Sequence, residues 1–587
     1  MKPSSASLSR TGAQNAPTAP SLQSSGNVEW APIERAPQVD CFERGPVASS
    51  ELTGRNRRPL WFRSVWGRSV WFRRAGPLGA AFVQALALAS WAQPAEATEP
   101  TRPTDPRIFA DSAVDIMQVA DAFDGPDDFD LNIRLTFEHS QRWAPIRRET
   151  SINQPGLATG GFIADTLNVG SYSSSTQKLI PEVSFGLLPD LALTLKLPVI
   201  LAHAQSIDSP DGASSNIATR GLDGEQLFPV PFNSPTRSGI ENLTVALDLS
   251  VMNQWRNPAN PTWTIGVEGR FNVSEAMHAC NPNAATGQVD CAHPADRNRN
   301  GTADNFGTDY DDLAGQPEGE FQGSRSPGVS RGTTGLEAHA YVSKRRGYIE
   351  PYSGVSAFFE FPTQGSDFGS SDIEGSLANH PPFRGTLVFG LAVIPWEQPE
   401  QHSRISLDFR ARGTYVSEGR DYSELFDALG SSSAASLRNP QFSEYTANIP
   451  DGSTSPDPFN PSVVDTQSSR VSFTGLTDVQ QHGDYDLSAR FTWQAGEYVN
   501  FDVGAEWRIV QGHMISFDQA CNPNFSGAAT VSGPCKYVSG YDGNTPEWEG
   551  AGKANPNYRR PINEPGHRFL VDTSNGLKAW VSARVMF

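Results

Sequence analysis

The stretch LKAWVSARVMF, residues 577–587, alternates apolar and polar side chains at every second position. Its apolar set is Leu577, Ala579, Val581, Ala583, Val585 and Phe587. Successive side chains of a β-strand point to opposite faces, so this pattern predicts a strand with one apolar and one polar face.

The same alternation recurs along most of the chain, for example in DFDLNIRLTFEH (128–139) and VNFDVGAEWRI (499–509). The pattern predicts strands near 129–138, 177–187, 191–202, 240–252, 262–273, 333–343, 348–361, 384–395, 404–416, 484–495, 499–511 and 577–587. Strands of ten to twelve residues, at ~3.3 Å per residue and tilted by ~40°, span about 25–30 Å. This length matches the apolar layer of a membrane.

The connections between these segments alternate between short and long. LPD at 188–190, KRRG at 344–347 and GEY at 496–498 are short, whereas other connections exceed twenty residues. An even number of strands leaves both termini on the short-turn side, so we assign HRFLVDT, 567–573, to the last long loop. The chain is therefore predicted to be all-β: a transmembrane, antiparallel, up-and-down β-barrel of about twelve strands.

The N-terminal region has the features of an export signal. An Arg- and Trp-rich run at 55–76 precedes the apolar stretch PLGAAFVQALALASWA, and Ala95-Glu96-Ala97 fits a cleavage site after Ala97. The apolar stretch is shorter than the ~20 residues of a spanning helix, which favours a signal over an anchor. We predict an extension and signal peptide at 1–97, a periplasmic lead-in at 98–127 and the barrel at 128–587.

Composition excludes two classes of protein. The whole chain has a formal charge of −19, and residues 1–97 contribute +5, which leaves −24 for the rest. Such an anionic chain is a poor binder of nucleic acid. A mean hydropathy of −0.42 excludes a bundle of membrane helices.

The phrase ACNPN occurs twice, at 279–283 and 520–524, and one further cysteine follows each copy. Neither pair has the C-x2-C spacing of a zinc site, and cleavage after Ala97 would leave an even number of cysteines in an exported protein. We therefore expect two disulfides, each closing a small ring at the base of a long loop. The expected pairs are Cys280–Cys291 and Cys521–Cys535.

Many charged residues fall on the face opposite the apolar one and would line the barrel. The predicted lumen residues are Arg134, Glu268, Arg270, Glu337, Arg410, Arg412, Arg490, Asp502, Glu506, Arg508 and Arg584. Two interpretations are open: a salt-bridged network that fills the lumen, or a polar conduit whose charges select solutes. Twelve strands lie between small filled barrels and open porins, so the bore should be narrow.

The loop at 274–332 contains DRNRNGTADNFGTD, which fits the first part of a calcium-binding loop. The candidate ligands are Asp296, Asn298, Asn300, Thr302 and Asp304. Position 12 is Gly307 and not the bidentate Glu of an EF-hand. The alternatives are a structural calcium site and an Asn/Asp-rich surface loop without metal; no other cofactor is expected.

Two features resemble known proteins. The alternating end at Phe587 resembles the assembly signal of Gram-negative outer-membrane proteins, which implies that location and the barrel-assembly machinery as a partner. PEVSFGLLPDLALTLKLPVIL (181–201) and SGIENLTVALDLSV (238–251) resemble a hairpin and strand of the outer-membrane proteins named after the meta-pathway of phenol degradation. That resemblance implies a channel for small, often hydrophobic compounds.

We therefore expect a channel in the outer membrane of a Gram-negative bacterium, for passive passage of small solutes, hydrophobic or aromatic compounds among them. The first alternative is a non-conducting adhesin or structural barrel that acts through its disulfide-closed loops. The second is a membrane-embedded hydrolase. H-x-S-N-G, G-x-S-x-G and H-E-x-x-H are absent from the sequence, so we assign no catalytic residue and expect no enzyme. The expected partners are outer-membrane lipid, the assembly machinery and a small solute.

Overall fold

The structure of this protein, a computed structural model, describes most of the chain between residue 112 and the C-terminus. The described residues are 112–120, 130–154, 161–210, 216–221, 224–282, 289–291, 326–363, 366–369, 376–432, 434, 437, 473–496, 498–517, 521–524, 538–542, 545–548 and 562–587. All of them belong to the unit Pro100–Phe587. The predicted signal peptide lies outside these residues and stays a prediction.

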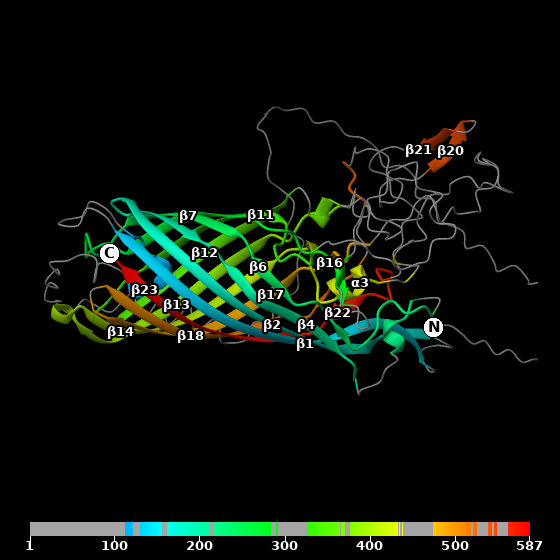
Figure 1. Ribbon diagram of the computed structural model, residues 1–587, viewed down its shortest axis with the longest axis horizontal. Coiled ribbons are helices and arrows are strands. Elements are labelled where there is room, and N and C mark those ends of the chain that lie inside the picture. Colours follow the sequence, from blue (N-terminus) through cyan, green and yellow to red (C-terminus); the bar gives the residue numbers. More distant parts are fainter. Residues whose placement is uncertain are drawn as a thin grey trace, which may run out of the picture. The chain divides into compact units, whose positions relative to one another are not determined.

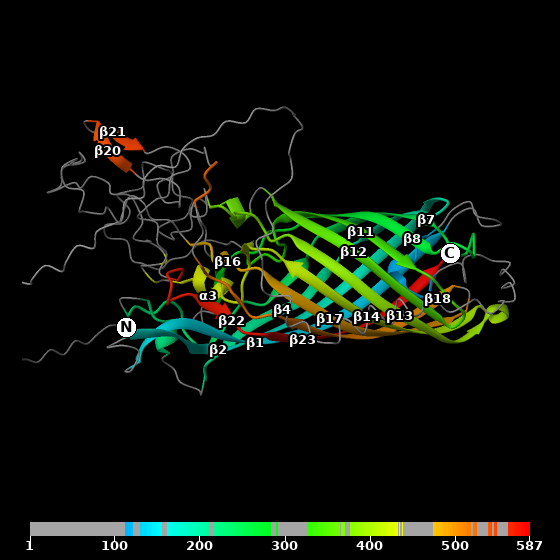
Figure 2. The same ribbon diagram turned by 180° about the vertical axis from the view of Figure 1, so that it is seen from behind.

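Antiparallel strands follow one another around a closed barrel of twelve strands (Figure 1, Figure 2). In chain order they are β1 (Leu131–Gln154), β2 (Gly161–Leu188), β3 (Leu191–Lys196) continued by β4 (Val199–Asp208), β6 (Arg237–Ile240) continued by β7 (Leu243–Met252), β8 (Thr262–Phe271), β11 (Thr333–Ser343), β12 (Ile349–Pro362), β13 (Arg384–Gln398), β14 (Ser403–Val416), β17 (His482–Ala495), β18 (Val499–Val510) and β23 (Ser574–Met586). Pairing of β1 with β23, from Asn132↔Met586 to Trp143↔Asn575, closes the ring. The predicted fold class is confirmed.

The outer surface of the barrel is apolar. Every second side chain along the strands faces outwards, and many of these are large hydrophobic residues that remain exposed. Examples are Leu135, Leu247, Val267, Leu336, Val355, Leu387, Phe409, Leu487, Val503 and Val581. Water does not tolerate such a continuous apolar surface, whereas a closed barrel in lipid satisfies its backbone hydrogen bonds internally. The barrel therefore spans a membrane, and the predicted outer-membrane location is confirmed.

Short turns join the strands at the end of the barrel where the C-terminus lies (Figure 1). The turn after β2 places Asp190 at a φ of 61°, a left-handed conformation that Asp tolerates. Exposed aromatic side chains mark this end at Tyr348, Trp396 and Tyr498, and the opposite, outer end at Phe137, Phe271, Phe361 and Tyr415. Two aromatic belts of this kind are typical of membrane barrels.

β1 and β2 are much longer than the alternation predicts. The predicted spans are 129–138 and 177–187, but β1 has 24 residues and β2 has 28. The inward face of β1 changes along the strand, because Thr136 and Glu138 are polar whereas Ala144 and Ile146, on the same face, are buried in an apolar cluster. Packing beyond the membrane therefore sets the length of these strands.

The long connections fold together into an outer cap, which we define as the described residues within 209–236, 274–332, 363–383, 417–481 and 511–573. The cap has an apolar core that continues onto the outer parts of β1, β2 and β4. Its buried side chains include Ile146, Tyr172, Ile207, Leu227, Phe228, Phe232, Leu425, Leu429, Phe473, Ile515, Ile562, Phe569 and Val571.

The assignment of HRFLVDT, 567–573, to a loop is wrong. β22 (Phe569–Val571) pairs with β1 at Ile146↔Val571, and β23 pairs with the same strand from Trp143↔Asn575. The two segments run in one direction and are separated only by Asp572 and Thr573. β22 thus extends the twelfth strand outwards, and the strand count is unchanged.

The remaining elements are short. The helices are η2 (Asp115–Met117), η4 (Ile217–Thr219), η6 (Asp367–Gly369), η8 (Pro399–Gln401) and α3 (Phe426–Gly430). The strands are β5 (Phe232–Asn233), β9 (Cys280–Pro282), β10 (Val289–Cys291), β15 (Gly419–Asp421), β16 (Thr477–Val479), β19 (His513–Met514), β20 (Val538–Asp542) and β21 (Thr545–Trp548). In the described part of the chain, none of the helices has the length and apolar character needed to cross a membrane.

Candidate functional site

Polar side chains line the inside of the barrel, because each strand that turns an apolar face to lipid turns its other face inwards. Strand register aligns them in rows: Arg134 of β1 lies opposite Glu182 of β2, which lies opposite Lys196 of β3. The predicted lumen residues fall into three groups. Arg134, Glu268, Glu337 and Arg584 border an inner cavity; Arg270, Glu337, Arg412, Glu506 and Arg508 border an outer cavity; Arg410, Arg490 and Asp502 anchor a segment that enters the lumen.

The outer cavity, which we call the outer chamber, has a volume of about 650 Å³. Barrel residues such as Arg412 form part of its wall, and the cap residues Tyr422 and Glu424 form another part. Seven basic and six acidic side chains border it, so the wall is strongly polar but nearly neutral. Most of these charges are paired: Arg412–Glu506 at 2.7 Å, Arg270–Glu337 at 2.8 Å, Arg331–Asp421 at 2.7 Å, Lys578–Glu506 at 2.9 Å and Arg508 with Asp484.

The inner cavity, which we call the inner chamber, has a volume of about 210 Å³. Arg134, Glu182 and Lys196 border it from the barrel wall. Glu337 and Tyr341 border both chambers, so a single layer of side chains separates the two cavities.

Residues 112–120, which we call the lumen segment, pack against inward-facing side chains of the barrel. They form the described part of the predicted periplasmic lead-in. The Ala113 amide donates to Glu350 Oε2 at 3.0 Å, and the Ser112 hydroxyl donates to the other oxygen of the same carboxylate. Apolar contacts add to these bonds: Val114 and Met117 cluster with Tyr352, Val388, Ala392 and Ile394.

Asp115 of the lumen segment binds two arginines of the barrel wall. Arg490 Nη1 lies 2.7 Å from Asp115 Oδ2, and the Arg410 guanidinium donates to Oδ1. Burial alone would raise the pKa of Asp115, but Arg410, Arg490 and Arg134 together hold that pKa well below its usual range. The carboxylate is therefore charged in the lumen, and its attraction to the arginines holds the segment.

Neighbouring side chains hold both arginines in position. The Tyr352 hydroxyl donates to Asp408 at 2.7 Å and accepts from Arg410 Nε at 2.9 Å. Tyr352 lies across Gly390, where an added Cβ would meet the phenol ring at 2.1 Å. Arg490 is held by Asp502 of β18, at 2.7 Å. These bonds orient the arginines towards Asp115.

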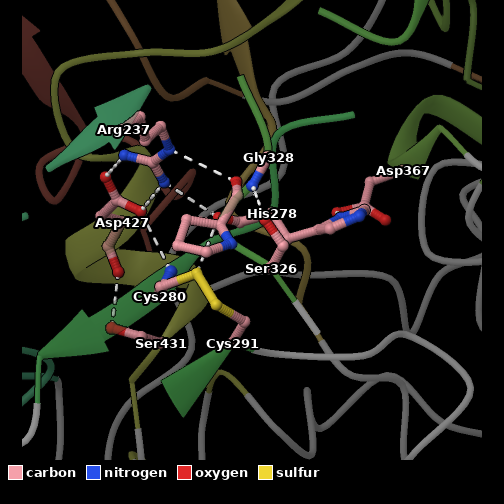
Figure 3. Close-up of a disulfide and its surroundings, with 10 residues drawn as sticks. Arg237, His278, Cys280, Cys291, Ser326, Gly328, Asp367, Asp427 and Ser431 are labelled. Atoms are coloured by element: carbon pink, nitrogen blue, oxygen red, sulfur yellow. Dashed lines mark hydrogen bonds and ion pairs between the residues drawn. A yellow bond between two sulfur atoms is a disulfide. The ribbon is translucent and has the colours of Figure 1, made fainter. Parts of the chain in front are cut away.

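A disulfide and a buried ion pair hold two cap connections and a barrel strand together (Figure 3). Cys280 and Cys291 form the expected disulfide, which joins β9 to β10. Beside it, Arg237 of β6 makes a bidentate pair with Asp427 of α3, at 2.9 and 2.6 Å. The Cys280 amide also donates to Asp427, at 3.0 Å. We call this group the cap knot.

The cap knot explains part of the first ACNPN phrase. Ala279 is buried against α3, and an added Cβ at Gly430 would lie 2.3 Å from the Ala279 Cβ. His278 extends the network, because its carbonyl accepts from Arg237 at 2.9 Å and its Nδ1 lies 3.0 Å from Asp367 (Figure 3). The phrase therefore binds the loop to two other connections.

Several predictions remain predictions. The calcium ligands and Cys535 lie outside the described residues; Cys521 is disulfide-bonded. Within the described ranges, no group of three or more His, Cys, Asp or Glu could hold a metal ion. Phe587 exchanges backbone hydrogen bonds with Leu131 at the end of the β1–β23 ladder, and its role as an assembly signal is untested.

The sequence analysis missed the entry of Asp115 into the lumen. The charges of the predicted inner face gave no signal, because carboxylates such as Glu350, Asp408 and Asp486 accompany the arginines on that face. The short apolar run around Asp115, in SAVDIMQVA, has the composition of a segment that packs inside a wall.

No family model and no curated protein matches the chain. Among solved structures, it is similar to a FadL homologue of Pseudomonas aeruginosa at 7% identity, over 78% of this chain and 90% of that one, with a TM-score of 0.27. An outer-membrane channel from Pseudomonas putida F1 is similar at 9% identity, over 78% and 95%, with a TM-score of 0.28. The outer-membrane protease OmpT of Escherichia coli is similar at 7% identity, over 79% and 97%, with a TM-score of 0.20. Both channels and a protease occur at these low scores, so the site is interpreted from its own residues.

Proposed function

We propose that this protein is a narrow outer-membrane channel for small polar solutes, and that the lumen segment closes its inner end. The observation that carries this proposal is the pair of polar chambers inside the barrel, separated by one layer of side chains at Glu337 and Tyr341. A lumen filled by its own salt bridges would leave no such space.

The chemistry of the walls favours polar solutes over the hydrophobic compounds that the family resemblance implies. Groups such as Arg412 and Glu506 are hydrated when a chamber holds water. A polar solute replaces those hydrogen bonds, whereas an apolar solute removes water and leaves charged groups without partners, at a cost of several kcal/mol.

The lumen segment is suited to act as a gate, because only a few contacts hold it. It is not part of the barrel sheet, so its departure breaks no hydrogen bond between strands. Its attachment depends on Asp115, on Glu350, on the hydrogen bond that Arg584 donates to Gln118 and on the small apolar cluster around Met117. Local opening of such a segment requires less free energy than unfolding of the barrel.

Single-channel conductance in a planar bilayer tests the proposal. The wild-type protein should give small, infrequent steps, and Asp115→Asn should open more often because the variant loses the charge that Arg410 and Arg490 bind. Asp572→Asn is the matched control, since Asp572 makes an exposed pair with Arg147 at 3.1 Å.

Silence of both the wild-type protein and Asp115→Asn, with folded barrels, would contradict a channel. The function would then shift to the outer cap, where the cap knot holds two connections against β6 in one arrangement that a surface adhesin could present.

A further inference from the structure

We propose that the inner chamber is a binding site for a small zwitterion that carries one ammonium and one carboxylate group, such as a small α-amino acid. The inference rests on the proposed function for its physiological meaning, because it names the class of solute that would pass. It rests on three side chains for its chemistry: Arg134, Glu182 and Lys196.

These three side chains form a row of alternating charges. No two neighbours in the row are close enough to form a hydrogen bond. Arg134 Nη1 lies 3.5 Å from Glu182 Oε1, and Lys196 Nζ lies 3.9 Å from Glu182 Oε2. A second carboxylate, Glu268, is 3.6 Å from Lys196. Charged N–H···O hydrogen bonds measure about 2.7–2.9 Å, so each separation is longer than a hydrogen bond.

The row differs from most of the charges around the outer chamber, although Arg384 there also lies 3.4 Å from its partner Glu360. Arg412 and Lys578 in the outer chamber bind carboxylates at 2.7 and 2.9 Å. Among the described residues, by contrast, the side chains of Arg134, Glu182 and Lys196 take part in no hydrogen bond. Their donors and acceptors are free to bind a molecule in the chamber.

Two buried polar atoms at the inner chamber also lack hydrogen-bond partners among the described residues. The Thr264 hydroxyl and Arg134 Nε are both shielded from solvent, and neither has a hydrogen-bond partner in the described part of the chain. Buried polar groups are normally hydrogen-bonded, so an occupant with donors and acceptors is expected here.

The barrel holds the row in place. Arg134, Glu182 and Lys196 are direct neighbours across β1, β2 and β3, and the backbone ladders of these strands fix their spacing. An ammonium group can donate to Glu182, while a carboxylate accepts from Lys196 and Arg134. A solute with only one of these groups satisfies half of the row and leaves the rest unmatched.

Calorimetric titration of the purified protein in detergent with L-alanine tests the site, with acetate and methylammonium as single-charge probes. We expect saturable binding of L-alanine and binding at least about tenfold weaker for either probe. Glu182→Gln should weaken L-alanine binding by about tenfold or more, because it removes a charge-assisted hydrogen bond. Glu397→Gln is the matched control, since Glu397 pairs with Arg345 near a short turn.

A second variant keeps the test decisive if Glu182→Gln does not fold. Lys196→Met removes the proposed carboxylate partner and should weaken L-alanine binding to a similar extent. Absence of saturable binding to the folded wild-type protein would overturn the proposal and leave water as the occupant. Equal affinity in the wild type and both variants would also overturn it.

The outcome is independent of conductance. Binding of L-alanine to a barrel that stays silent in a bilayer would support the site and contradict the channel. Conductance without L-alanine binding would support the channel and contradict the site.

Discussion

At the scale of single residues, Asp115 connects the lumen segment to the barrel. Its two partners also contact other carboxylates: Arg410 contacts Asp408 of the same strand, and Arg490 contacts Asp502 of the neighbouring strand β18. The result is a chain of alternating charges in which each group is the partner of the next. Such networks are favourable when complete and costly when one member is removed.

This arrangement predicts how pH acts on the gate. The pKa of Asp115 is lowered in the closed state, so its stabilising contribution is fully present above the value of a free Asp, about 3.9. The contribution is lost as pH falls through the lowered pKa. The open probability of Asp115→Asn should therefore exceed that of the wild type by a constant factor from pH 8 to about pH 4, and the two should converge below that.

Conductance recorded at steps of pH for both proteins checks this prediction. Comparing the two removes the effect of every other titrating group, because they share all of them. Convergence between pH 5 and 7 would mean that burial raises the pKa of Asp115 and that the two arginines do not dominate.

At the scale of elements, the cap knot joins the barrel strand β6 to β9 and α3, which belong to two separate connections. The side chains of Arg237 and Asp427 are each only 2% exposed, so neither charge can be hydrated when its partner is removed. Removal of one partner of such a buried pair costs about 3–5 kcal/mol.

We therefore expect Asp427→Ala to loosen the cap and to leave the barrel intact. Limited proteolysis should cut the cap of this variant much faster than that of the wild type, while resistance of the barrel to unfolding in detergent stays the same. Asp572→Ala removes an exposed pair and should cost less than about 1 kcal/mol. Equal cleavage of both variants would show that the cap does not depend on the knot.

At the scale of the whole molecule, the barrel depends on lipid around its outer face. Val503, near the middle of β18, is 53% exposed on that face, and Ile217 is 74% exposed in the cap. Both are apolar, but only Val503 belongs to the apolar surface of the barrel wall.

Val503→Arg should lower the free energy of unfolding from lipid vesicles by about 2–4 kcal/mol, because it places a charge in the apolar layer. Ile217→Arg should change it by less than about 0.5 kcal/mol, since Ile217 is exposed outside the wall. Urea titration of both variants in vesicles measures the difference. A similar small effect for both would contradict the assignment of the β18 face to lipid.

The sequence by itself determined the barrel. Alternation at Leu135 and Thr136, or at Val503 and Asp502, is a local property, because the covalent geometry of a strand sends neighbouring side chains to opposite faces. The twelve strands, their order and the polar inner face follow from this pattern and from the alternation of short and long connections. Two cysteines in one loop were also enough to predict the Cys280–Cys291 disulfide.

Only the tertiary structure decided what fills and covers the lumen. Asp115 meets Arg410 across 295 positions of sequence, and no local pattern encodes such a contact. The cap core joins Ile146, Phe228, Leu429 and Phe569 from four distant segments, and it also lengthens β1 and merges β22 with the twelfth strand. Local periodicity indicates which face of a strand a side chain occupies, whereas the residue that it contacts depends on how the whole chain folds.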